Sequence, residues 1–247
     1  MIYGSFAQYY DELFDDELYL KWQHYVEINT TPDMHLLDLA GGTGRLGVLL
    51  AQDGYDVTDA DLSEEMLALA SHHASEANVD LQLITANMLD LQGLGQYDVV
   101  TCFADSFCYL QDLDEVQTAF EQVYQHLVPH GQFLFDIITP YQTDEVYPGF
   151  MFNYQSSDDR RFFMWSSFAD DGVKHGVIHE LSFFDRQPDG QYERLSETHF
   201  ERSYELSQVQ GVLQKVGFTS IEVTSEFGTA PIKEDTTRWF FKCQRGE

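Results

Sequence analysis

The chain has 247 residues, of which 43% are hydrophobic and 15% aromatic, so it is long and apolar enough to bury a full α/β core in one domain with at most a modest insertion. Its 42 acidic and 13 basic residues give a formal net charge of −29, which would repel a phosphate backbone and argues against a nucleic-acid partner. Cys102, Cys108 and Cys243 lack paired metal spacing, so we expect reduced thiols and no metal site.

The sequence gives no sign of a membrane partner. No uninterrupted apolar stretch is long enough to span a bilayer. The first residues, MIYGSFAQYYDELFDDE, are acidic and aromatic, whereas a signal peptide begins with basic residues and continues with an apolar segment. We therefore expect a cytoplasmic protein, as a monomer or a homodimer.

The first half of the chain alternates between helix and strand patterns. An apolar helical stripe comes first, formed by Phe6, Tyr9, Tyr10, Leu13 and Phe14. Strands are predicted at residues 34–39, 55–61, 81–84, 98–103 and 132–138. Helices lie between them, one of them with Ser63 as its N-cap and another ending near Pro129 and Gly131. This alternation predicts a parallel sheet with helices on both faces.

The pattern changes after Pro140. Residues 161–168, 173–185 and 191–204 read as strands separated by turns, which predicts an antiparallel meander. A helix that ends at Gly217 and two strands, residues 220–227 and 238–243, complete the chain. We therefore expect one α/β domain made of residues 1–140 and 204–247, with an antiparallel β cap inserted at residues 141–203.

A glycine-rich turn follows the first predicted strand. Gly42, Gly44 and Gly47 have the spacing G-x-G-x-x-G, which lets the backbone approach a ligand at the start of a helix. Asp61 ends the next strand, where a carboxylate commonly binds ribose hydroxyls. Taken alone, this pattern suits NAD equally well, so an NAD-dependent oxidoreductase remains an alternative.

Asp38 and its surroundings favour a different cofactor. A dinucleotide-binding strand is normally apolar at this position, whereas a carboxylate could hold an ammonium group. Residues 36–44, LLDLAGGTG, resemble the first motif of class I S-adenosylmethionine-dependent methyltransferases. Four later blocks continue the resemblance in order: VTDADLSEEMLALA, ITANMLDL, YDVVTCFADSFCYL and HLVPHGQFLFDIITP. The resemblance implies a Rossmann-like methyltransferase that converts S-adenosylmethionine to S-adenosylhomocysteine.

The same resemblance implies which residues bind the cofactor. They are Asp38, Ala40, Gly41, Gly42 and Gly44 around the methionine end, Asp61 at the ribose, Leu62, Asn87 and Met88 at the adenine, and Phe103 beside the methionine. Asn87 stands where the family usually has an Asp. Its amide oxygen can still accept a hydrogen bond, but it carries no charge. Asp38 and Asp61 also have a simpler interpretation, as caps of the helices that follow them.

The N-terminal YYDEL resembles a segment of amino-sugar and glycine N-methyltransferases, in which an N-terminal helix covers the methyl site. By that resemblance Tyr10 would be catalytic and Tyr9 would contact the acceptor, unless both only pack in the helical stripe. Asp105, Ser106 and Tyr109 follow a strand at the carboxyl edge of the sheet, where ligands collect. We expect Asp105 to act in catalysis and the other two to contact the acceptor.

The predicted cap offers Trp165 and His179 as further acceptor contacts. It would select the acceptor and exclude water, although its aromatic residues would suit a dimer interface as well. We expect methyl transfer to N or O of a small molecule, and the acidic surface would also suit a basic protein acceptor. A cofactor-binding module without turnover is the non-enzymatic alternative.

Overall fold

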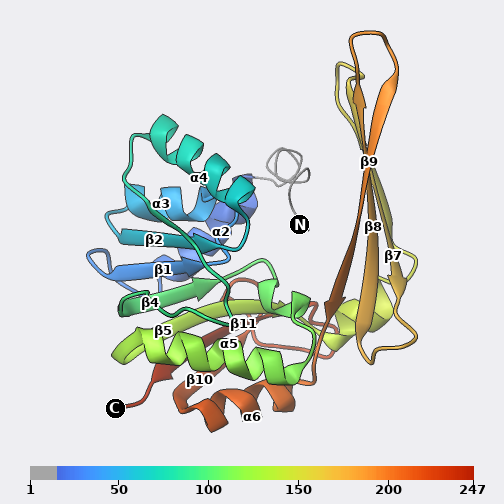
Figure 1. Cartoon of the computed structure of the whole chain (residues 1–247). Coiled ribbons are helices and arrows are strands. Elements are labelled where there is room, and N and C mark those ends of the chain that lie inside the picture. The colour runs from blue at the N-terminus through green and yellow to red at the C-terminus, as the bar shows by residue number, and fades with distance from the viewer. Residues whose placement is uncertain (1–15) are drawn as a thin grey trace.

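The computed structural model describes residues 16–247, so the predictions for Tyr9, Tyr10 and the first helical stripe lie outside the described residues. Two β-sheets make up the fold, and helices flank the first of them (Figure 1). The elements around the first sheet are α2 (Asp16–Glu27), β1 (His35–Leu39), α3 (Arg45–Gln52), β2 (Asp56–Asp61), α4 (Glu64–Ala77), β3 (Gln82–Thr85), β4 (Tyr97–Cys102), η1 (Ser106–Tyr109), α5 (Leu113–His126), β5 (Leu127–Ile138), α6 (Leu206–Val216), β10 (Phe218–Thr224) and β11 (Arg238–Arg245).

The main sheet has seven strands in the order β10-β11-β5-β4-β1-β2-β3. The strands from β3 to β5 pair in parallel, while β11 pairs antiparallel with both β5 and β10. The carboxyl ends of β1, β2, β4 and β5 therefore meet at one edge, which we call the carboxyl edge. The predicted Rossmann-like fold with helices on both faces is confirmed.

Successive residues of each strand are buried on opposite faces of the main sheet, as the strand period of two requires. Leu36 and Val99 pack with α2 and α3, whereas Leu37 and Val100 pack with α5 and α6. The predicted helix boundaries at Ser63 and Gly217 are confirmed. The Ser63 hydroxyl accepts from the start of α4, and Gly217 ends α6 in a left-handed conformation with a φ of 117°.

The junction between α5 and β5 differs from the sequence prediction. The turn residues 129–131 predicted a break before the strand, but they lie inside β5. Leu127 pairs with Tyr97, and the register then shifts so that Gln132 pairs with Val99. The turn residues therefore mark an irregularity within the strand, which the backbone absorbs without a loop.

The second sheet is antiparallel, with the order β6-β7-β8-β9. Its strands are β6 (Met151–Gln155), β7 (Arg161–Ala169), β8 (Gly176–Arg186) and β9 (Tyr192–Arg202), and they follow the short helical turn η2 (Gln142–Val146). Three of these strands were predicted, whereas β6 was missed. Every residue of β6 is exposed, and among the described strands β6 pairs with β7 alone, so no burial pattern marks it in the sequence.

Figure 1 shows the second sheet as a long, narrow sheet that stands beside the carboxyl edge of the main sheet. These strands lie inside the predicted insertion at residues 141–203, whose role as a separate unit stays a prediction. Among the helices of residues 16–247, none is long and apolar enough to cross a membrane.

Candidate active site

The glycine loop, residues 40–44, connects β1 to α3 at the carboxyl edge. Its backbone is left-handed at Ala40 and Gly42, with φ values of 59° and 62°. The N–H of Ala40 donates to the carbonyl of Ala60 at 2.7 Å, and the N–H of Gly42 donates to Oδ2 of Asp61 at 2.9 Å. The end of β2 therefore holds the loop in place.

Asp61, the last residue of β2, organises two turns with one carboxylate. Its Oδ2 accepts from Gly42, and its Oδ1 accepts from the N–H of Ser63 at 2.8 Å. Ser63, and not Asp61, is the N-cap of α4. Burial raises the pKa of Asp61, although these backbone hydrogen bonds oppose the shift. Each carboxylate oxygen still has a lone pair for another donor.

A row of buried polar side chains crosses the sheet beside the glycine loop. The strand register places Asp38 of β1 between Asp59 of β2 and Thr101 of β4. The Thr101 hydroxyl donates to Oδ1 of Asp38 at 2.7 Å. Oδ2 of Asp38 and both carboxylate oxygens of Asp59 have no hydrogen-bond partner among the described residues. Burial raises the pKa of Asp38 to about 7, and it raises the pKa of Asp59 well above its usual range.

A second polar group joins the ends of β4, β5 and β11. The Arg238 guanidinium donates to Oδ1 of Asp136 at 2.7 Å and to Oδ2 of Asp105 at 3.1 Å. Asp136 also accepts from Nε1 of Trp22 at 2.7 Å and from the backbone N–H of Asp105 at 2.8 Å. Burial raises the pKa of Asp105 to about 6, even though Arg238 opposes the shift. We call these four residues the Arg238 cluster.

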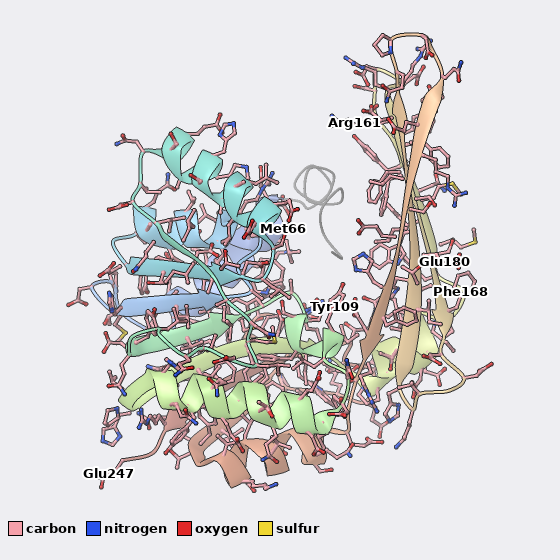
Figure 2. All side chains as sticks on the ribbon, viewed as in Figure 1. Met66, Tyr109, Arg161, Phe168, Glu180 and Glu247 are labelled. Atoms are coloured by element: carbon pink, nitrogen blue, oxygen red, sulfur yellow. The ribbon has the colours of Figure 1, made fainter. Side chains whose placement is uncertain are left out.

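The second sheet has an outer and an inner face. Figure 2 shows Phe168 and Glu180 on the side away from the main sheet. His179 precedes Glu180 in β8, so its side chain lies on the opposite, inner face, where it is buried. Nδ1 of His179 accepts from the Ser167 hydroxyl at 2.7 Å and from the Trp165 indole N–H at 3.1 Å. The two predicted acceptor contacts on this sheet therefore lie side by side.

Glu201 of β9 lies next to His179 on the inner face. Nε2 of His179 is 3.6 Å from Oε1 of Glu201. Within the part of the chain that the structure describes, neither this Nε2 nor Oε2 of Glu201 has a hydrogen-bond partner, and both side chains are buried. Because the indole of Trp165 can only donate, Nδ1 of His179 is an acceptor, and Nε2 carries the proton of the neutral ring.

The loop after β4 contacts the second sheet. The Tyr109 hydroxyl lies 3.3 Å from Nδ1 of His199 in β9. Figure 2 shows Tyr109 at the end of the main sheet that faces the second sheet. The Ser106 hydroxyl donates to the carbonyl of Phe103 at 2.8 Å. Phe103 itself is buried and stacks on Trp22 with a centroid distance of 6.1 Å.

The remaining predicted cofactor residues lie near the ends of β2 and β3. Leu62 is 65% exposed, which is unusual for an apolar side chain beside a buried carboxylate. Asn87 is exposed, and its Oδ1 accepts from the N–H of Leu89 at 3.0 Å, whereas Met88 packs against the larger core cluster. In residues 16–247, no group of three or more His, Cys, Asp or Glu side chains is arranged to hold a metal ion.

Sequence reasoning missed Asp59, Asp136, Glu201 and Arg238. Asp136 is the single charge in the apolar stretch QFLFDII, and Asp59 interrupts a strand otherwise read as buried, so a buried charge was a usable signal for both. Glu201 and Arg238 carry no such signal, because charged residues are common near the ends of exposed strands.

The chain resembles known methyltransferases along its whole length. Residues 36–131 match the methyltransferase domain family. A relative from Geobacillus sp. (strain WCH70), named as a methyltransferase, is 36% identical over 99% of this chain and 100% of its own length. The crystal structure of an S-adenosylmethionine-dependent methyltransferase from Clostridium acetobutylicum ATCC 824 is 29% identical with a TM-score of 0.84, covering 99% of both chains. A sugar N-methyltransferase from Streptoalloteichus sp ATCC 53650 shares the fold at 19% identity with a TM-score of 0.80, covering 98% of this chain and 93% of its own.

The sheet order, the glycine loop after β1 and the carboxylate that ends β2 define a Rossmann-like enzyme that binds a nucleoside cofactor. The chain belongs to the class I S-adenosylmethionine-dependent methyltransferases, so the resemblance seen in the sequence is confirmed. It is an enzyme, and its cofactor is S-adenosylmethionine. Neither the oxidoreductase nor the non-catalytic alternative is retained.

Proposed function

We propose that the enzyme methylates a nitrogen or oxygen of a small molecule that binds where the inner face of the second sheet meets the loop after β4. One observation carries this proposal. His179 and Glu201 are buried side by side, and each has a polar atom that lacks a partner among the described residues. Buried polar groups are normally hydrogen-bonded, so two neighbouring side chains that each keep an atom without a hydrogen bond indicate a ligand position.

The residues at the glycine loop fit the cofactor. Oδ2 of Asp38 is buried without a partner in residues 16–247 and could accept from the methionine ammonium group, with the backbone of Ala40, Gly41, Gly42 and Gly44 beside it. Asp61 would accept from the ribose hydroxyls through its remaining lone pairs. Leu62 and Met88 offer apolar contacts for the adenine. Because the oxygen of Asn87 already accepts from Leu89, its amide N–H groups are better placed to contact the ring.

When bound, S-adenosylmethionine supplies a methyl group that is activated by the sulfonium. The chain's own residues then have to orient the acceptor and accept the proton that it loses. Glu201 and Asp105 are carboxylates at this position, and the charge of Glu201 contributes to the raised pKa of Asp105. Ser106, Tyr109, Trp165 and His179 would orient the acceptor.

The charges at this junction favour an amine over a hydroxyl acceptor. The charges of Asp136 and Glu201 both act on Asp105, while Arg238 is ion-paired with Asp105 and Asp136. A site with excess negative charge stabilises an ammonium group and the positive charge that develops on an attacking nitrogen. On this proposal, residues 141–203 form an acceptor-binding cap.

Paired amine and alcohol acceptors test the proposal. Methyl transfer from labelled S-adenosylmethionine would be measured with small amines and with analogues that carry a hydroxyl in place of the amine. We expect transfer to amines, and we expect Glu201→Gln to lower kcat/KM about a hundredfold because a general base is lost. Glu180→Gln is the matched control, since Glu180 is exposed on the outer face of the same sheet.

The outcomes separate the parts of the proposal. Transfer only to the alcohols would contradict the amine preference. Equal rates for the two glutamine variants would remove Glu201 from the site. Cofactor affinity, measured by calorimetry, should be unchanged in both variants, because neither residue lies at the glycine loop.

A further inference from the structure

Asp59 lies directly beneath the glycine loop. A Cβ atom added to Gly41 would lie 2.4 Å from Oδ1 of Asp59, and one added to Gly44 or Gly47 would lie 3.2 Å from Oδ2. Because the three glycines have no side chains, the carboxyl group of Asp59 fits in the space beside them. Asp59 is completely buried, and neither of its oxygens has a hydrogen-bond partner in the described part of the chain.

Asp59 and Asp38 form a pair of adjacent buried carboxyl groups. They are register partners on the parallel strands β2 and β1, so their side chains lie on the same face of the sheet. Among residues 16–247, the hydroxyl of Thr101 is the hydrogen-bond donor to this pair, and it donates to Asp38. Two carboxylates in one buried site cannot both ionise without a large cost, so such a pair retains a proton.

We propose that Asp59 and Asp38 share one proton in the cofactor-free protein, and that binding of the cofactor's methionine ammonium group releases this proton to solvent. The proposal rests on the proposed contact between Asp38 and that ammonium group. It makes Asp59 a positioning residue of the cofactor site, because Asp59 acts on the ligand through the charge of Asp38.

The chemistry follows from proton linkage. A positive charge beside Asp38 stabilises the state in which both carboxyl groups are ionised, so the O–H bond of the shared proton breaks and the proton passes to the buffer. Burial keeps the pKa of Asp38 at about 7 before binding, so release takes place near neutral pH. Cofactor affinity therefore rises with pH, by at most about tenfold per pH unit for one linked proton.

Among the residues that the structure describes, few other ionisable groups lie around the pair. Arg45 at the start of α3 is ion-paired with Asp16 at 2.7 Å, and Nδ1 of His73 on α4 lies 2.8 Å from the carbonyl oxygen of Thr43. The remaining groups that face the pair are Asp61 of β2 and Cys102 of β4. His73 is the histidine among them, so the experiment has to separate it from Asp59.

The experiment uses S-adenosylhomocysteine as the probe, because it carries the same ammonium group and does not react. Calorimetric titrations of the full chain at pH 7, in buffers of different ionisation enthalpy, count the protons released per ligand bound. We expect release of a large fraction of one proton and an affinity that rises from pH 6 to pH 8. Binding without proton release and with a flat pH profile would overturn the proposal while leaving the cofactor site intact.

Asp59→Asn separates Asp59 from its neighbours. The amide can neither hold the proton nor carry a charge, so Asp38 ionises at a lower pH, proton release at pH 7 falls, and the variant binds the probe more tightly than the natural protein at pH 6 and similarly at pH 8. A purely structural role would weaken binding equally at both values. Undiminished proton release in Asp59→Asn would assign the proton to a group other than the pair, such as Asp38 alone, and would also overturn the proposal.

Two further variants serve as a control for loss of a charge and as a replacement if Asp59→Asn does not fold. Asp56→Asn is the matched control, because Asp56 lies on the same strand with its side chain 73% exposed, and it should behave like the natural protein. If Asp59→Asn does not fold, Asp59→Ser removes the same proton with a smaller side chain and should give the same loss of release.

Discussion

The glycine loop and the Arg238 cluster are both built on carboxylates, but they are held together in different ways. At the loop, Asp61 accepts from Gly42 and Ser63, which lie 19 and 2 residues away in the chain. In the Arg238 cluster, Arg238 reaches Asp136 across 102 residues and Asp105 across 133 residues. One half of the site is assembled by local chain geometry, and the other half forms only when distant strands meet.

This difference predicts that mutations in the two regions have different consequences. The hydrogen bonds of Asp61 come from backbone groups, which remain close to the loop when the side chain is shortened. The carboxylate of Asp136 is fully buried and depends on side chains from other elements. Mutations at the loop should therefore affect ligand binding first, and mutations in the cluster should affect folding first.

The largest effect is expected for Arg238→Met. Removal of the guanidinium leaves the buried carboxylate of Asp136 and the partly buried one of Asp105 without their cation, which should lower the free energy of unfolding by about 3 kcal/mol. Urea unfolding followed by circular dichroism measures this loss. Arg238→Lys keeps the charge and should recover part of the stability. A loss below about 1 kcal/mol would mean that the cluster is solvated like a surface pair, and the contrast with the loop would fail.

A smaller effect on stability, but a large one on binding, is expected for Asp61→Ala. The proposed charge-assisted hydrogen bonds to the ribose are worth roughly 1.5–3 kcal/mol, so S-adenosylmethionine should bind about ten- to a hundredfold more weakly to a protein that still folds. Asp61→Asn keeps an acceptor oxygen and should give an intermediate value. Calorimetry measures both, and an unchanged affinity in the folded alanine variant would remove the ribose role.

The same difference explains how much of the molecule the sequence predicted. Asp38, the glycine loop and Asp61 follow one another along one strand–turn–helix–strand unit. The glycine spacing therefore marked the loop, and the resemblance to the family's first motif implied the roles of these residues. Ser63 as a cap and Gly217 as a stop are local signals as well, and both are confirmed.

The parts that were missed depend on tertiary structure. Arg238 lies in the last strand, and nothing near it in the sequence indicates that β11 pairs beside β5 and brings it to Asp136. Glu201 is one of several charged residues on β9, and only the pairing of β8 with β9 places it near His179. The edge strand β6 has no buried side chain, so its pairing with β7 leaves no periodic pattern.

The smallest effect concerns Asp105, which joins the Arg238 cluster to the proposed acceptor position. Its pKa is raised from 3.8 to about 6 by burial, so between these values the folded protein holds a proton that the unfolded chain has lost. The stability associated with this proton is present below about pH 4 and is lost as the pH rises through about 6. In Asp105→Asn this loss is absent, so the stability of the variant relative to the natural protein should increase with pH, by at most about 1.4 kcal/mol per pH unit.

Thermal or urea unfolding between pH 4.5 and 7 measures this slope, with the exposed Asp171→Asn as a control that should show none. The slope also decides between two descriptions of the cluster. If the difference between Asp105→Asn and the natural protein does not change with pH, Arg238 keeps Asp105 ionised throughout, and Asp105 cannot be the group that changes protonation when an acceptor binds. If the difference in stability grows up to about pH 6 and then levels off, burial outweighs the ion pair, and Asp105 can exchange a proton at the junction of the two sheets.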